Sequence, residues 1–131
     1  MTGGTEWLID AFDCAPARLG SRTDINALLA DAIAQLHLTV VTQAEHQFPD
    51  PPGITAMVLL AESHLTIHTF PESGVATLNL YCCAPSALHH NFDWSACCAR
   101  HLGAGAVKIT VADRGGQAAR AQIQANVSVA S

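Results

Sequence analysis

Three consecutive strand-like segments joined by short connections constrain this chain more than any other feature. Residues 54–60 form a near-continuous apolar run, and residues 65–70 alternate between apolar and polar side chains. A third segment, residues 75–83, follows directly after the turn at residues 71–74. Strands joined by connections this short pair side by side in opposite directions. The sequence therefore predicts an antiparallel sheet at the centre of the fold.

Two helices are predicted on either side of these strands in the sequence. Asp24 is the expected N-cap of a helix over residues 24–36, where apolar residues recur at helical spacing. A second helix is expected over residues 92–102, ended by Gly103. The remaining segments are predicted as strands at 6–12, 38–44 and 106–112, a proline-rich loop at 48–53, and a flexible tail at 115–131.

Together these elements predict a single α+β domain over residues 1–131. The architecture is a two-layer sandwich, with helices on one face of a mainly antiparallel sheet. The other face of such a sheet needs a cover, and in a chain of 131 residues a second subunit is the natural one.

The composition indicates a globular protein of the cytoplasm. Half of the residues are apolar, 13% are charged, and the formal net charge is -5. No basic cluster is present, which argues against nucleic-acid binding. No apolar stretch approaches the length of a membrane span, and the N-terminus lacks the basic start of a secretion signal. Five cysteines, an odd number, then favour free thiols in a reducing compartment.

Reactive side chains are concentrated between Ala61 and Glu72, where a serine, two histidines and two carboxylates stand beside core strands. His64 and His68 fall on the same face of an extended strand, about 13 Å apart at 3.3 Å per residue. That separation is too large for both to bind one metal ion. Each residue alone is ordinary for a strand or turn, so the function rests on their joint spacing.

The run Glu62-Ser63-His64, then His68-Thr69-Phe70-Pro71-Glu72, with Cys83 downstream, closely resembles the self-processing motif of the prokaryotic S-adenosylmethionine decarboxylases. The resemblance extends over about residues 7–112 and is concentrated in residues 53–83. It implies cleavage of the chain between Glu62 and Ser63. The products would be a β chain, residues 1–62, and an α chain, residues 63–131.

The resemblance also implies how the cofactor is made. The Ser63 hydroxyl attacks the Glu62 carbonyl, and the resulting ester is eliminated to leave a pyruvoyl group at the start of the α chain. His68 is the implied base of this processing, and the Thr55 hydroxyl assists the cyclic intermediate. The pyruvoyl group then forms a Schiff base with the substrate amine and serves as an electron sink during decarboxylation.

The implied substrate is S-adenosylmethionine, which on decarboxylation becomes the aminopropyl donor for spermidine synthesis. Cys83 is the implied proton donor to the carbanion. Glu72 is the implied partner of the ribose hydroxyls, and Phe48 and Phe70 are candidates to stack on the adenine. The family pairs two processed protomers, so the implied assembly is a homodimer, (αβ)2, with active sites at the seam.

Departures from the family pattern lie around the substrate and leave the processing residues intact. The changed positions are Phe70 for tryptophan, Ser73 and Val75 for tyrosines, Asn79 for aspartate, and Cys82 and Ala84 for threonine and glycine. A related pyruvoyl-dependent decarboxylase acting on ornithine or arginine is therefore an alternative. A non-processing binding protein on the same fold is a second alternative.

No metal site is predicted. The adjacent pairs Cys82-Cys83 and Cys97-Cys98 lack the Cys-x₂₋₄-Cys spacing of structural zinc sites, even with His101 nearby. Cys97 and Cys98 are expected to pack one side of the second helix.

Overall fold

Six strands form one sheet in the order β2-β3-β4-β5-β1-β6, and all neighbours in it are antiparallel. The structure is a computed structural model that describes residues 3–130, with side-chain surroundings described up to residue 123. The strands are β1 (Gly4–Phe12), β2 (Val40–Gln47), β3 (Ile54–Leu60), β4 (Ser63–Phe70), β5 (Val75–Cys82) and β6 (Ala106–Arg114). The helices are α1 (Pro16–Leu19), α2 (Arg22–Gln35), α3 (Ala87–His90), α4 (Trp94–Leu102) and α5 (Gln117–Ala130).

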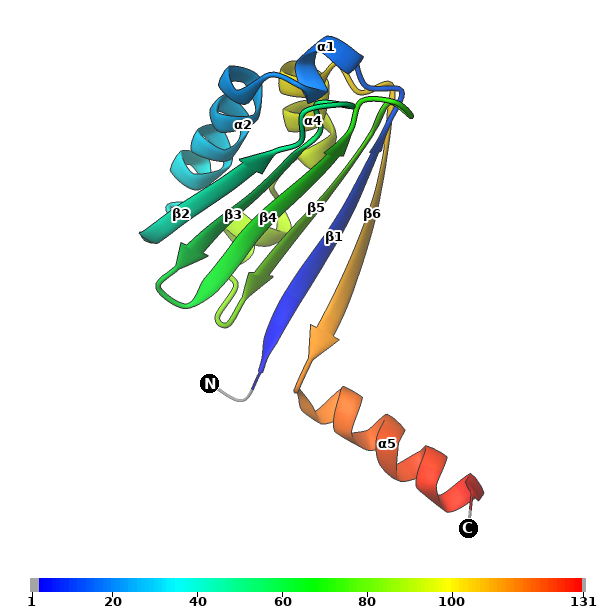
Figure 1. The fold of residues 1–131 in the computed structure, drawn as a ribbon. Helices are drawn as coiled ribbons and strands as arrows, with labels where there is room; N and C mark the ends of the chain where they lie inside the picture. Colours follow the sequence, from blue (N-terminus) through cyan, green and yellow to red (C-terminus); the bar gives the residue numbers. More distant parts are fainter. Residues whose placement is uncertain (1–2, 131) are drawn as a thin grey trace.

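The helices α1, α2 and α4 cover one face of the sheet, and the opposite face, called here the open face, lies bare (Figure 1). Side chains alternate accordingly. In β3, for example, Ile54, Ala56 and Val58 are buried toward the helices, whereas Met57 and Leu59 are exposed. The predicted α+β two-layer architecture is confirmed. The large apolar side chains exposed on the open face are Leu8, Phe12, Met57, Leu59 and Phe70.

The helix boundaries differ from the prediction because side-chain caps set them. Ser21, not Asp24, is the N-cap of α2: its hydroxyl accepts a hydrogen bond from the Asp24 backbone N–H at 3.2 Å. Asp93 caps α4 in the same way through the Ala96 N–H, so that helix begins at Trp94. Gly103 ends it in the left-handed conformation at φ 66°, as predicted. The short helices α1 and α3 were not predicted.

The C-terminal segment, predicted as a flexible tail, contains helix α5. Helix α5 leaves the end of β6 and projects away from the sheet (Figure 1). The flexibility predicted for residues 115–131 stays a prediction. Among the described residues, no helix is both long enough and apolar enough to cross a membrane.

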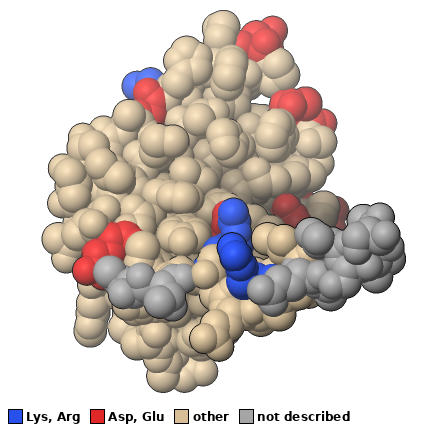
Figure 2. Space-filling model, turned by 90° about the horizontal axis from the view of Figure 1, so that it is seen from below, with Lys and Arg blue, Asp and Glu red and all other residues tan. Residues whose placement is uncertain are grey.

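Charged side chains are sparse on the face that contains the lower ends of the strands. Figure 2 shows that face as largely uncharged, with its Lys and Arg atoms in small separate groups at the centre and near one edge. This surface carries no extended basic stripe of the kind that binds nucleic acid.

Candidate active site

Ser63 opens β4 directly after a two-residue turn. Leu60 and Ser63 are paired residues at the ends of β3 and β4, and Ala61 and Glu62 form the turn between them. The Glu62–Ser63 peptide bond therefore lies at the tip of a β-hairpin. Ser63 is half-buried and lines a cavity of about 330 Å³ together with Glu62, which is exposed. This site is called here the serine cavity.

Cys82 lies directly opposite Ser63 in the β4–β5 ladder and lines the serine cavity. Burial raises the pKa of the Cys82 thiol above its ordinary value, and the side chain is 7% exposed. Cys83 follows the end of β5, is half-buried, and is absent from the described lining of the cavity. The structure thus brings Cys82 to Ser63, while the role predicted for Cys83 stays a prediction.

Two histidines that the sequence did not single out for catalysis also line the serine cavity, His37 and His89. The His89 ring stacks on Trp7 with centroids 6.3 Å apart, and its Nδ1 accepts a hydrogen bond from the Ser86 backbone N–H. Burial lowers the pKa of His89, which favours the neutral imidazole near neutral pH. Nothing in the local sequence signals these residues, because they reach Ser63 only through the packing of distant segments.

A second cavity, of about 340 Å³, lies at the other end of β4 and gathers the remaining predicted site residues. It is called here the aromatic cavity. The hydroxyl of Thr55 and Nδ1 of His68 are 3.2 Å apart, because the two residues are directly paired across β3 and β4. The cavity lining includes Phe48, Thr55, His68, Phe70 and Glu72.

The aromatic cavity has the composition expected of an organic ligand site. Phe48 is 51% exposed and Phe70 is 39% exposed, so both rings have surface free for a ligand. Glu72 adds a carboxylate at the turn after β4. Apolar rings with a few polar groups are typical of small-molecule pockets, and the volume lies in the usual range.

The serine cavity and His68 are far apart within one chain. Ser63 and His68 are five residues apart on β4, which corresponds to about 16 Å at 3.3 Å per residue. Because the spacing is odd, their side chains also point to opposite faces of the sheet. A proton cannot pass directly between these two side chains in a single chain.

Asn79 has a structural partner on the open face. Its Nδ2 donates a hydrogen bond to Oε1 of Glu6 at 2.8 Å, and the other carboxylate oxygen of Glu6 pairs with Arg114. The bond from Asn79, followed by the contact with Arg114, holds the pKa of Glu6 below its ordinary value although burial opposes this. An aspartate at position 79 would instead place two carboxylates side by side.

The family model described as S-adenosylmethionine decarboxylase matches residues 5–115. The chain is 36% identical over 80 residues to the S-adenosylmethionine decarboxylase proenzyme of Parasynechococcus marenigrum, which covers 61% of this chain and 62% of that protein. It is 39% identical over 80 residues to the proenzyme of Pseudomonas paraeruginosa, covering 61% and 49%. These alignments span less than two thirds of both relatives.

A solved structure agrees with the sequence matches. The crystal structure of the adenosylmethionine decarboxylase from Aquifex aeolicus superposes with a TM-score of 0.75 at 30% identity, covering 88% of this chain and 92% of that one. The family match extends from the first strand to the end of the sixth, so it includes the whole sheet. This chain belongs to the S-adenosylmethionine decarboxylase family.

Proposed function

We propose that this protein is a self-processing, pyruvoyl-dependent decarboxylase of S-adenosylmethionine. The observation that carries the proposal is the Glu62–Ser63 bond at the tip of the β3–β4 hairpin, beside the serine cavity, in a chain of this family. A hairpin tip leaves the peptide bond free to distort, and the cavity leaves room for a substrate amine to approach.

The residues present fit a pyruvoyl group made from Ser63. Attack of the Ser63 hydroxyl on the Glu62 carbonyl exchanges the amide bond for an ester. Removal of the Ser63 Cα proton then breaks the ester, frees the Glu62 carboxylate, and leaves dehydroalanine at position 63. Water hydrolyses the imine form of this residue, which releases ammonia and leaves the pyruvoyl ketone. When bound, the pyruvoyl group supplies the electron sink for loss of carbon dioxide. Ser63 already borders the serine cavity, which leaves room for the substrate amine.

Cleavage at this point leaves the sheet intact. Strand β1 of the first fragment pairs with β5 and β6 of the second, and β3 pairs with β4. Strands of the two fragments are neighbours at three places in the sheet, so backbone hydrogen bonds of three strand pairs still join the fragments after the bond is cut. Residues 1–62 and 63–131 are thus expected to stay together as one folded domain.

The distance between Ser63 and His68 supports an active site shared by two copies of the chain. The open face exposes apolar side chains that a second copy would cover, including Leu8, Met57 and Leu59. In a twofold dimer the same surface of each protomer forms the interface, and corresponding strands of the two protomers run in opposite directions. His68 and Thr55 of one protomer would then lie near the Glu62–Ser63 hairpin tip of its partner, and the Ser63 side chain, which points to the helix face within one chain, would turn toward them for processing.

S-adenosylmethionine fits the aromatic cavity better than a basic amino acid does. Phe48 and Phe70 offer rings to an adenine and to the sulfonium charge, and the carboxylate of Glu72 offers acceptors to ribose hydroxyls. Ornithine and arginine would offer these rings a cation, but neither an adenine nor ribose hydroxyls. Substitution of the family tryptophan by Phe70 still keeps an aromatic face at that position.

Two measurements test the proposal. Intact-mass spectrometry of the purified protein should show fragments of residues 1–62 and 63–131, the second blocked to N-terminal sequencing, and Ser63→Ala should stay one chain. A single chain after long incubation would support the non-processing alternative instead.

Release of labelled carbon dioxide from S-adenosylmethionine, ornithine and arginine then shows which of them is the substrate. Turnover of a basic amino acid alone would overturn the choice of substrate.

A further inference from the structure

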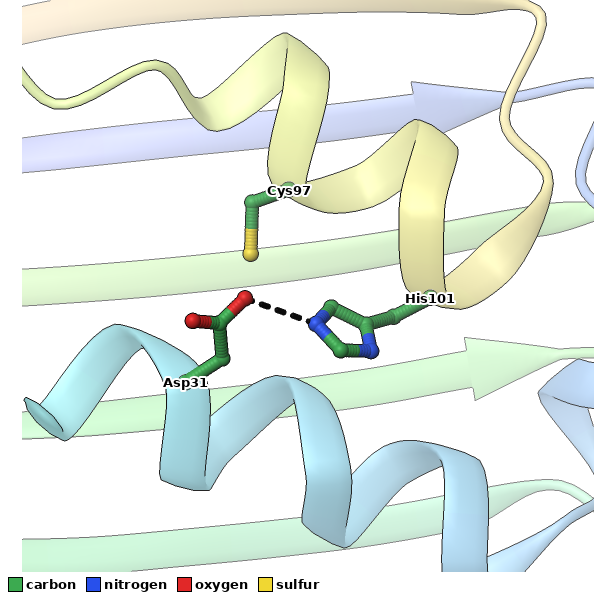
Figure 3. Close-up of side chains that lie close together, drawn as sticks. All are labelled: Asp31, Cys97 and His101. Carbon is green, nitrogen blue, oxygen red and sulfur yellow. Dashed lines mark hydrogen bonds and ion pairs between the residues drawn. The ribbon is translucent and has the colours of Figure 1, made fainter. Parts of the chain in front are cut away.

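Three potential metal ligands meet between helices α2 and α4, outside both cavities described above. Asp31 belongs to α2, and Cys97 and His101 belong to α4 (Figure 3). One ligand atom from each residue lies within 4.8 Å of the others. Cys97 and His101 are four residues apart on a helix, so their side chains project from the same face. Figure 3 shows the thiol and the imidazole both directed at the Asp31 carboxylate.

From this cluster we infer a binding site for one Zn²⁺ ion, held by the Cys97 thiolate, the His101 imidazole and the Asp31 carboxylate. Thiolate, imidazole and carboxylate are the three ligand types that Zn²⁺ takes in proteins. A single carboxylate is too few oxygens for Ca²⁺ or Mg²⁺. Three protein ligands leave the fourth tetrahedral position to water.

The Cys97 thiol is the buried member of the cluster. Cys97 is 2% exposed. The neighbouring thiol of Cys98, 0% exposed, lies outside the cluster.

The edge of the site is open enough for an ion to enter. The side chain of Asp31 is 22% exposed and that of His101 is 16% exposed. Nε2 of His101 and Oδ2 of Asp31 are 2.8 Å apart, so a small separation of the two would admit an ion between them. Arg100, which also contacts Oδ2 at 2.8 Å, is 57% exposed and can turn to solvent. One thiolate and one carboxylate then balance the two positive charges of Zn²⁺.

Cobalt absorption tests the site directly. The full chain, reduced with a phosphine and freed of metal with a chelator that is then removed, is titrated with Co²⁺. We expect one equivalent to give a thiolate-to-cobalt charge-transfer band and the strong visible bands of tetrahedral cobalt. Zn²⁺ should displace both. Cys97→Ala should abolish the charge-transfer band, and His101→Gln should weaken Co²⁺ binding by more than about tenfold.

Cys98→Ala is the matched control, because it removes the same atoms from the adjacent buried position of α4 and should keep the band. Zn²⁺ should raise the melting temperature of the wild type and of this control, but not of Cys97→Ala. The inference is overturned if the wild type gives no charge-transfer band, or if the band survives in Cys97→Ala. If Cys97→Ala does not fold, unchanged binding by His101→Gln overturns it as well.

Discussion

Ser63 and His68 lie near opposite ends of the same strand, β4, and their side chains point to opposite faces of the sheet. Ser63 shares a cavity with Cys82, whereas His68 bonds Thr55 in the other cavity. Sequence proximity therefore does not make these two residues partners within one chain.

His68 is expected to act on Ser63 of a second copy. Alone, His68→Ala should slow processing by about 10²–10⁴-fold and accumulate an ester that hydroxylamine cleaves. When His68→Ala and Ser63→Ala chains are coexpressed, the mixed dimer pairs an intact Ser63 with an intact His68. Mass spectrometry should then show cleavage of the His68→Ala chain.

Failure of this complementation, with mixed dimers present, would exclude His68 of the partner as the base. His37 and His89, which line the serine cavity, would become the candidates. His37→Gln and His89→Gln test them, and the same mass measurement reports the result. A chain that stays monomeric at micromolar concentration yet processes fully would contradict the shared site.

Thr55 is expected to support processing through its hydroxyl. The hydroxyl lies 3.2 Å from Nδ1 of His68, so it can orient that ring or stabilise charge on the cyclic intermediate. Thr55→Val keeps the shape and should slow processing by about 10²-fold. Thr55→Ser keeps the hydroxyl and should process at close to the wild-type rate. Equal rates for both variants would show that the hydroxyl has no part.

The two adjacent cysteines are expected to differ in role. Cys83→Ala should process normally but lose about 10²-fold or more in carbon dioxide release, as expected for a missing proton donor. Cys82 lies opposite Ser63, and its thiol pKa is raised by burial, which keeps it protonated at neutral pH. If Cys83→Ala keeps full turnover while Cys82→Ala loses it, the donor is Cys82. Rates are compared on fully processed protein.

Asn79→Asp is expected to destabilise the fold in a pH-dependent way. Loss of the hydrogen bond to Glu6 should cost about 1.5–3 kcal/mol at pH 7, where two carboxylates would face each other. In the wild type the pKa of Glu6 is lowered, so its stabilising contribution is present above its unfolded-state pKa and is lost as the pH falls through the folded-state pKa.

Urea unfolding at several pH values measures this effect. The difference in free energy of unfolding between wild type and Asn79→Asp should be largest near neutral pH and should shrink on acidification. Protonation relieves the repulsion between the two carboxylates of the variant, and the wild type loses the stabilising contribution of ionised Glu6. Asn79→Ala, which removes the donor without adding a charge, is the control. A difference that stays constant with pH would contradict the role given to Glu6.

The sequence alone determined the features that depend on neighbouring residues. Alternating side chains and short connections predicted the antiparallel order of β3, β4 and β5, because strand period and turn length are local properties. The placement of Glu62 and Ser63 between two of these strands follows from the same pattern. Helix starts were less predictable, since Ser21 and Asp24 are both good caps and only the backbone path selects one.

Only the tertiary structure decided which distant residues meet. Cys82 reaches Ser63 through strand register, whereas His37, which follows α2, and His89, in α3, reach it through the packing of those helices near the end of the sheet. The cluster of Asp31 with Cys97 and His101 exists because α2 and α4 pack side by side on one face. Local sequence carries no signal of such contacts, because they depend on how whole elements bury their apolar surfaces against each other.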